Sequence, residues 1–308
     1  MLKSFLLFLS RRQGLKQLMV AFRPTRDLTW RFVAGETLAD CVAAVKAVNA
    51  KGLTATLDHL GENVTSEALA TASADAYIKG LEAIAAEKLD ANVSLKLTQM
   101  GLDLGEAFTY GNVRRIIQRA KELGIFVRID MESSEYVDQT LALLKKFRAE
   151  HEQVGIVLQS YLYRTPLDLS TVTTDWNCRV RMVKGAYKEP KAVAFQKKSQ
   201  VDEEYLARSR EMLIDARDHG RYHAFATHDE AMIAGIKKMA EELQVPKSAY
   251  EFQMLYGIRR DLQDGLRAEG WNVRVYIPYG TDWYPYLMRR MAERPANLIF
   301  VMKNMVKG

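Results

Sequence analysis

The sequence predicts an α/β fold in which eight parallel strands close into a (β/α)8 barrel. Eight short runs rich in β-branched and aromatic residues alternate with amphipathic segments of helical length. No linker interrupts the alternation, and no strand is followed by the Gly-x-Gly-x-x-Gly turn that an open doubly wound sheet uses to bind a dinucleotide. Single barrels commonly reach 308 residues, and 48% hydrophobic content is sufficient for their core. We therefore expect a closed barrel rather than an open sheet.

We expect the chain to have two parts, an N-terminal helical segment over residues 1–50 and a barrel domain over residues 51–308. Residues 1–33 mix apolar and basic positions. This mixture is typical of an amphipathic helix packed on the domain, and it also suits a membrane surface or a subunit contact. Residues 5–9 are apolar but too few to span a bilayer, and no small-residue cleavage site follows them, so we expect no signal peptide.

The predicted strands are short runs whose apolar positions alternate with polar ones or follow one another directly. Both patterns are typical of strands, the second of strands buried on both faces. The eight runs are residues 53–57, 93–97, 126–130, 155–159, 179–184, 223–227, 250–254 and 271–277.

A helix is predicted before the first strand, over residues 36–50, and another after each strand. Pro278 and Gly280 are expected to break the eighth strand, and Pro295 to stop the final helix. The eight later helices cover residues 66–88, 112–123, 135–151, a short piece around 167, a long piece ending before 220, 230–243, 259–269 and 281–294.

Polar side chains gather where the predicted strands end. Functional groups of a barrel lie at the C-terminal ends of its strands, although any one polar residue there is more often structural. Eleven such residues together indicate a site. They are Asp58, His59, Lys96, Asp130, Gln159, Arg181, Lys184, Thr227, His228, Gln253 and Tyr276.

The final predicted helix carries Tyr286, Arg289, Arg290 and Glu293 at helical spacing, so the four residues share one face. Two adjacent arginines can clamp a carboxylate or a phosphate through their planar donor groups. Taken alone, the pattern also fits a solvated face with an Arg289–Glu293 bridge. Because the strand ends add further cations, we expect anionic ligands in the barrel mouth, one bearing phosphate and one bearing a carboxylate.

The overall charge narrows the choice of partners. A formal charge of +6 fits an anionic substrate, an anionic cofactor or a negative membrane surface. We expect no nucleic-acid partner, because no basic stripe is interleaved with aromatic residues. We also expect no metal, because neither Asp58-His59 nor His228 belongs to a cluster with ligand spacing.

Six motifs make the chain resemble the proline dehydrogenase family, both its short bacterial form and the catalytic domain of bifunctional proline utilisation A. The resemblance runs from about Leu53 to Phe300, and each motif falls on a predicted strand end or on the final helix. The motifs are Ser94-Leu95-Lys96-Leu97-Thr98, Arg128-Ile129-Asp130-Met131-Glu132, Val180-Arg181-Met182-Val183-Lys184-Gly185-Ala186-Tyr187, Phe225-Ala226-Thr227-His228, Phe252-Gln253-Met254-Leu255-Tyr256-Gly257 and Tyr286-x-x-Arg289-Arg290-x-x-Glu293.

The resemblance implies a distorted barrel whose last helix lies over the mouth. It implies FAD as cofactor and the oxidation of L-proline to Δ1-pyrroline-5-carboxylate, the first step of proline catabolism to glutamate. Electrons would pass to membrane quinone, so the protein would be cytoplasmic and peripherally associated with the inner face of the cell membrane. A pyrroline-5-carboxylate dehydrogenase is a further candidate partner.

The resemblance also implies roles for individual residues. Arg289 and Arg290, assisted by Lys96, match the clamp for the substrate carboxylate, and Asp130 matches the carboxylate that orients this cationic group. Four residues match the substrate pocket, namely Tyr276 as an aromatic wall, Leu255 as an apolar floor, and Tyr187 and Tyr286. Lys96, Asp130, Tyr276, Arg289 and Arg290 form the expected catalytic set. The residues expected around FAD are Asp130, Met131, Gln159, Arg181, Val183, Lys184, Gly185, Ala186, Thr227, His228, Gln253, Leu255, Arg290 and Glu293.

Two alternatives remain open from the residues alone. Lys96 and Lys184 both end strands, and a lysine flanked by cations could form the Schiff base of a barrel aldolase. A basic membrane- or nucleic-acid-binding protein would explain the charge but not the ordered motifs. The sequence departs from the bifunctional pattern between Gly280 and Tyr286, where the connection is shorter and carries Trp283 and Pro285.

Overall fold

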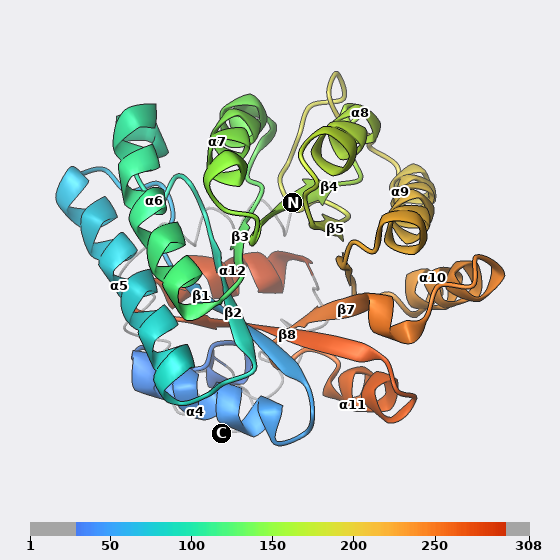
Figure 1. Ribbon diagram of the computed structural model, residues 1–308, viewed down its shortest axis with the longest axis horizontal. Coiled ribbons are helices and arrows are strands. Elements are labelled where there is room, and N and C mark those ends of the chain that lie inside the picture. The colour runs from blue at the N-terminus through green and yellow to red at the C-terminus, as the bar shows by residue number, and fades with distance from the viewer. Residues whose placement is uncertain (1–28, 294–308) are drawn as a thin grey trace, which may run out of the picture.

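The eight predicted strands form a closed parallel barrel in the order β1 to β8, which confirms the fold class (Figure 1). The computed structural model describes residues 29–293, and for residues 289–293 it describes the backbone alone. The barrel closes where β1 pairs with β8, from Thr54 beside Arg274 to His59 beside Tyr279. The strands are β1 Thr54–His59, β2 Ala91–Leu95, β3 Val127–Ile129, β4 Val154–Gln159, β5 Val180–Val183, β6 His223–Ala226, β7 Tyr250–Leu255 and β8 Asn272–Tyr279.

Helices surround the strands, as Figure 1 shows. They are α4 Leu38–Asn49, α5 Glu67–Ala86, α6 Glu106–Leu123, α7 Val137–Glu150, α8 Thr165–Ser170, α9 Lys198–His219, α10 Glu230–Glu242, α11 Arg260–Ala268 and α12 Trp283–Glu293. Short 3₁₀ turns cover Leu102–Leu104, Ser134–Tyr136 and Lys247–Ala249, and a π-helical turn, Thr171–Asp175, extends α8.

Local sequence explains where several helices begin and end. A capping box between Thr37 and Asp40 starts α4, and the Ser66 side chain accepts a hydrogen bond from the Leu69 amide at the start of α5. Gly124 and Gly220 end α6 and α9 in the left-handed conformation, which glycine adopts without steric penalty.

Most predicted boundaries are shifted by one or two residues, as in β2, which covers residues 91–95 rather than 93–97. The start of α6 and the end of β8 are wrong for identifiable reasons. Helix α6 begins at Glu106, six residues before the expected start. Gly105 is its N-cap, and Gly111 lies inside the helix rather than before it. Strand β8 continues through Pro278 to Tyr279. Its neighbour β7 ends opposite Tyr276, so no β7 residue pairs with Pro278, and the missing N–H of the proline is tolerated there.

Helix α4 packs against β1 and β8. The expected boundary at residue 50 therefore falls between α4 and the first strand, and the division of the chain into two parts stays a prediction. Residues 1–28, which make up most of the predicted N-terminal segment, lie outside the described part. Over residues 29–293, no helix is long and apolar enough to cross a bilayer.

The barrel interior is polar near its mouth, whereas the apolar core lies between the strands and the helices. Hydrogen bonds there join strands that are not neighbours. Arg181 on β5 and Tyr276 on β8 both donate to Asp130, which directly follows β3. These side chains therefore point into the barrel, and they line the cavity described below.

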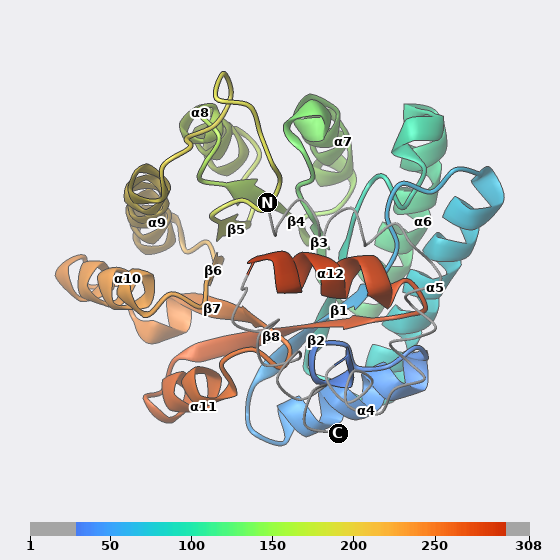
Figure 2. The same ribbon diagram turned by 180° about the vertical axis from the view of Figure 1, so that it is seen from behind.

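Helix α12 lies across the C-terminal end of the barrel (Figure 2). A second apolar cluster holds it there, made of Phe32, Val33, Leu60, Trp283, Tyr284, Tyr286, Leu287 and Met288. The Trp283 indole is fully buried and donates to Glu36 Oε1 at 2.8 Å. The final helix thus covers the mouth, as the resemblance implies.

Candidate active site

A cavity of about 480 Å³ opens at the C-terminal ends of the strands, next to α12. Of the eleven predicted strand-end residues, His59 alone does not line it. Every residue to which the resemblance assigns a role, and whose side chain the structure describes, lines it. Those residues are Lys96, Asp130, Met131, Gln159, Arg181, Val183, Lys184, Gly185, Ala186, Tyr187, Thr227, His228, Gln253, Leu255, Tyr276 and Tyr286. The structure brings them together, and their individual roles stay predictions.

Asp130 is the centre of the charged part of this cavity. Its Oδ1 accepts hydrogen bonds from Arg181 and Ser94, and its Oδ2 accepts one from the Tyr276 hydroxyl at 2.7 Å. The Lys96 ammonium lies 3.7 Å from Oδ2. Burial alone would raise the pKa of this carboxyl, but the two cations and the two hydroxyl donors lower it below its usual range. Asp130 is therefore an ionised anchor for its neighbours.

Lys96 lies between two carboxylates. Its ammonium is 3.2 Å from Asp58 Oδ1, closer than it is to Asp130. Asp58 is fixed in turn by the buried Tyr77 hydroxyl of α5, 3.3 Å away. Burial disfavours the charged form of Lys96, but Asp58 and Asp130 outweigh it and raise the pKa of the lysine. A Schiff-base nucleophile needs a neutral amine, so the aldolase alternative finds no support at Lys96.

Arg181 contacts several members of the site. It donates to Gln253 Oε1 at 3.1 Å, and its guanidinium lies 5.2 Å from the centre of the Tyr276 ring. Its Nε is buried, and no acceptor within residues 29–293 bonds to it. An unpaired buried donor on the wall of a cavity favours an acceptor on a bound group.

Lys184 is only half-buried and already paired. Its ammonium lies 2.5 Å from Asp202 and 2.9 Å from Asp229, and Lys198 bonds to the same two carboxylates. The position at the end of β5 agrees with the prediction. A phosphate at this point would have to share Lys184 with two aspartates.

The predicted residues on the far side of the cavity are held by the backbone. Gln159 donates its amide to the Glu132 carbonyl at 2.9 Å. The His228 Nε2 accepts from the Leu255 amide at 2.9 Å, which places the proton of the neutral ring on Nδ1. Gly185 has a φ of +117°, and a Cβ there would lie 2.4 Å from the Tyr161 ring. Only glycine fits, so the backbone itself lines this part of the wall.

Sequence reasoning missed Glu132. Its carboxyl accepts from the Thr98 amide at 3.0 Å and lies 2.5 Å from the Thr98 hydroxyl. Burial raises the pKa of Glu132 to about 7, against the smaller opposing effects of Thr98 and Lys96. Glu132 is not among the residues that line the cavity, whereas Glu62, Asp229 and Ile258 line it, and Ser94 and Tyr77 lie behind it. Glu132 ends one of the six motifs, two residues after Asp130, and that position was the sequence signal for it.

Three predicted site residues belong to the last two turns of α12. Arg289, Arg290 and Glu293 are placed by backbone alone, and their side chains lie outside the described part of the structure. The carboxylate clamp therefore stays a prediction. Tyr286, on the same face, is buried and lines the cavity. This part of the α12 face is therefore not solvated. Among the described residues, no group of three or more His, Cys, Asp or Glu side chains could hold a metal.

The sequence of the chain is similar to a known enzyme family and to several of its members. Residues 41–303 match the family model described as proline dehydrogenase. The chain is 44% identical over 307 residues to proline dehydrogenase 1 of Bacillus subtilis (strain 168), with 100% of each chain covered. It is 46% identical over 289 residues to proline dehydrogenase of Deinococcus radiodurans, covering 92% of this chain and 91% of the relative.

A solved structure shows the same architecture. Proline utilization A from Bdellovibrio bacteriovorus, inactivated by N-propargylglycine, superposes with a TM-score of 0.80 and 26% identity. The match covers 87% of this chain and 32% of that longer one. The matched family, the full-length relatives and the shared barrel give one answer: this chain belongs to the proline dehydrogenase family of enzymes.

Proposed function

We propose that this protein uses FAD to oxidise L-proline to Δ1-pyrroline-5-carboxylate and passes the electrons to membrane quinone. The reaction would be the first step from proline to glutamate. One observation carries the proposal. Lys96, Arg181 and Tyr276 converge on the ionised Asp130 in a cavity covered by the helix that carries Arg289 and Arg290.

The cations account for substrate binding. Lys96 stays protonated, so it attracts a carboxylate as a point charge, and the predicted Arg289–Arg290 pair adds planar donors that fix its orientation. The same positive charge disfavours the ammonium form of proline, so the amine loses its proton to water more readily. Tyr276, held by its bond to Asp130, forms a fixed wall for the pyrrolidine ring.

Three features of the cavity fit FAD. Arg181 has a buried Nε that lacks an acceptor among the described residues, Gly185 leaves backbone exposed where a side chain cannot fit, and Lys184 supplies a cation at a strand end. These residues, with Gln159, Thr227, His228 and Gln253, would hold the cofactor. Bound there, FAD supplies the hydride acceptor that proline oxidation needs.

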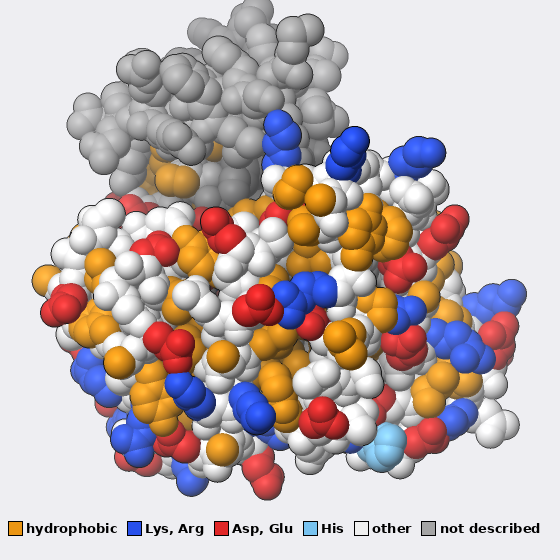
Figure 3. Space-filling view, turned by 90° about the horizontal axis from the view of Figure 1, so that it is seen from above, with side chains coloured by type: hydrophobic (Ala, Val, Ile, Leu, Met, Phe, Trp, Pro, Cys, Tyr) orange, Lys and Arg blue, Asp and Glu red, His pale blue; other side chains and the backbone are white. Residues whose placement is uncertain are grey.

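The proposed location is the cytoplasm, with peripheral association at the inner face of the cell membrane. Its support is the mixture of apolar and basic residues over residues 1–28, which suits an anionic lipid surface. On the described surface seen in Figure 3, acidic and basic side chains are interspersed. A pyrroline-5-carboxylate dehydrogenase, which would consume the product, is a proposed partner.

The test is turnover with a soluble dye as electron acceptor, with the pyrroline product trapped by an aromatic aminoaldehyde. We expect product to form from L-proline only when the protein is loaded with FAD. If FAD-loaded protein reduces the dye with other amino acids but forms no pyrroline product from proline, the proposed substrate is wrong.

A further inference from the structure

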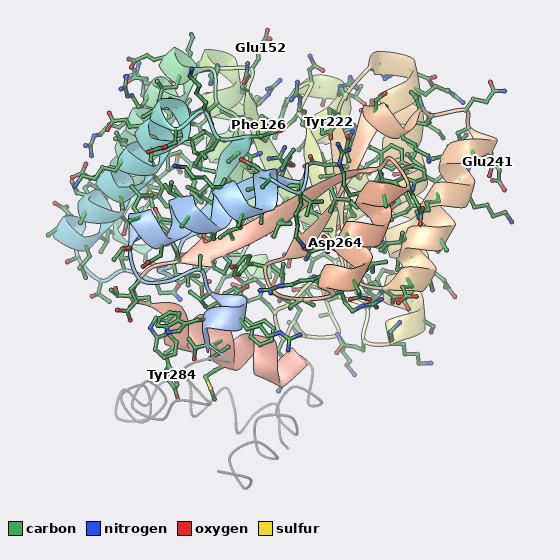
Figure 4. The ribbon with its side chains drawn as sticks, turned by 90° about the horizontal axis from the view of Figure 1, so that it is seen from below. Phe126, Glu152, Tyr222, Glu241, Asp264 and Tyr284 are labelled. Atoms are coloured by element: carbon green, nitrogen blue, oxygen red, sulfur yellow. The ribbon has the colours of Figure 1, made fainter. Side chains whose placement is uncertain are left out.

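A chain of buried polar side chains runs from the cavity toward the opposite end of the barrel. Arg181 donates to Gln253 Oε1 at 3.1 Å, and the Gln253 amide donates to Glu251 Oε1 at 2.5 Å. Glu251 also accepts from Arg274 Nε at 2.9 Å and from the Tyr222 hydroxyl at 3.2 Å. Figure 4 shows Tyr222 and Tyr284 near opposite ends of the molecule, so this series of hydrogen-bonded side chains leads away from α12.

Glu251 does not line the cavity, although Gln253 and Arg181 do. It is 2% exposed and belongs to β7. Burial would raise the pKa of its carboxyl, but the paired Arg274 lowers it, so the group is ionised. A buried, ionised carboxylate one layer below a ligand cavity accepts hydrogen bonds and donates none.

Arg181 and Glu251, on either side of Gln253, allow its side-chain amide only one orientation. Arg181 can only donate, so it requires the Gln253 carbonyl, whereas the ionised Glu251 can only accept, so it requires the Gln253 NH₂ group. If the Gln253 amide were turned over, donor would face donor at Arg181 and acceptor would face acceptor at Glu251. Glu251 therefore determines which atom of Gln253 faces Arg181.

We propose that Glu251 is a positioning residue of the active site, which holds Arg181 in place by fixing the Gln253 carbonyl. Arg181 is thereby directed toward Asp130, and its unpaired Nε is left available for the cofactor. The inference rests on the proposed function, because it takes FAD to be the group that Arg181 serves. Its consequences concern cofactor affinity and redox potential as well as turnover.

Glu251→Gln is the most informative change. Glu251 Oε1 accepts from both Gln253 and Arg274, and Oε2 lies 3.0 Å from Arg274 Nε. The NH₂ group of a glutamine at position 251 must therefore face either Gln253 or Arg274, so one donor–donor contact is unavoidable. We expect FAD to bind about tenfold to a hundredfold more weakly, the range for losing one charge-assisted hydrogen bond. We also expect the flavin midpoint potential to fall, because a displaced cation stabilises the reduced flavin less.

Glu251→Asp separates position from charge. The aspartate keeps a carboxylate near Arg274 but is one methylene shorter, so it no longer reaches the Gln253 amide. We expect it to weaken FAD binding in the same direction as Glu251→Gln. This variant also keeps the inference testable if the charge-removing one fails to fold.

A double-mutant cycle with Gln253→Met tests whether Glu251 acts through Gln253. Gln253→Met removes the relay and leaves Glu251 paired with Arg274. In that background, Glu251→Gln should cause no further loss of FAD affinity and no further change of potential. A full additional loss would show that Glu251 acts through space or through stability, and would overturn the proposal.

Asp215→Asn is the matched control, because Asp215 is also a carboxylate paired to buried groups. It accepts from His223 Nε2 at 2.7 Å and from Arg221 at the N-terminal end of β6. It should lower the melting temperature of the apoprotein without moving FAD affinity or potential. If wild type fails to bind FAD, the proposed function falls. If wild type binds FAD and both Glu251 variants match it, only the role of Glu251 falls.

Discussion

At the scale of single residues, the site is a balance of buried charges around Asp130. Lys96 stays cationic because two carboxylates raise its pKa, and Arg181 is paired with Asp130, so the positive charge that faces the cavity is not left unpaired. That arrangement limits the cost of burying the lysine, and it suits the anionic substrate group of the proposed function.

The predicted clamp can be tested by Arg290→Lys. A lysine keeps the charge but loses the planar donor pair, so kcat/KM for proline should fall by about tenfold to a hundredfold, the effect of losing one charge-assisted hydrogen bond. Steady-state kinetics separate a loss confined to KM from one that also reaches kcat. FAD content should stay near wild type. Lys184→Ala is the opposite control and should lose flavin. Unchanged proline kinetics in Arg290→Lys would mean that this face of α12 is only a solvated surface.

Glu132 should make stability depend on pH. Burial gives it a pKa of about 7 in the folded protein against an ordinary 4.5, so the folded state holds the proton more tightly than the unfolded chain. Its contribution to stability is therefore greatest below the ordinary pKa and is lost as pH rises through about 7.

Glu132→Gln mimics the protonated form at every pH. We compare the free energy of unfolding of the variant with that of wild type. As the pH rises from about 4 to about 8, this difference should change in favour of the variant by up to about 3 kcal/mol. Urea unfolding across that range measures the difference. A difference that shrinks with rising pH would mean that Glu132 is charged in the folded state.

At the scale of elements, α12 is attached to the barrel through its first half. Trp283 is fully buried, lies 5.8 Å from the Trp30 ring and bonds to Glu36. The remaining turns carry the residues predicted to hold substrate. The anchor therefore sets where those residues lie over the mouth.

Trp283→Ala should release this anchor. We expect a loss of about 3 to 5 kcal/mol of stability and a higher KM for proline, with FAD affinity kept. Trp271→Ala is the matched control, because Trp271 is also buried but precedes β8 at the other end of the barrel. It should cost stability without raising KM. Equal effects of both variants on KM would contradict a specific role for the anchor.

The elements were largely predictable because strand periodicity and cap residues are local signals. The start of α6 and the end of β8 were not, since Gly111 obscured one helix and the tolerance of Pro278 depends on where β7 stops. The strand-end residues of the cavity were likewise predictable from their position. Some of their partners were not. Asp58 meets Lys96, and Glu251 meets Arg274, between neighbouring strands whose pairing and register no local signal gives.

At the scale of the whole molecule, the barrel supplies the chemistry and the N-terminal residues are proposed to supply membrane contact. A truncation that begins at Thr29 keeps Trp30 and Phe32, which pack near α12. It should retain proline turnover with a soluble dye and lose binding to anionic vesicles. Co-sedimentation with vesicles and the dye assay measure the two properties. A folded truncation that binds vesicles as the full chain does would show that the segment is not the anchor.

The central claim is that the cavity at the mouth of this barrel binds FAD and oxidises proline. Anaerobic titration of the purified, FAD-loaded protein with L-proline, followed by visible absorbance, tests it most directly. We expect flavin absorbance near one equivalent per chain that bleaches as proline is added and returns when a quinone is supplied. A protein that cannot be loaded with FAD, or a bound flavin that proline leaves oxidised, would contradict the claim.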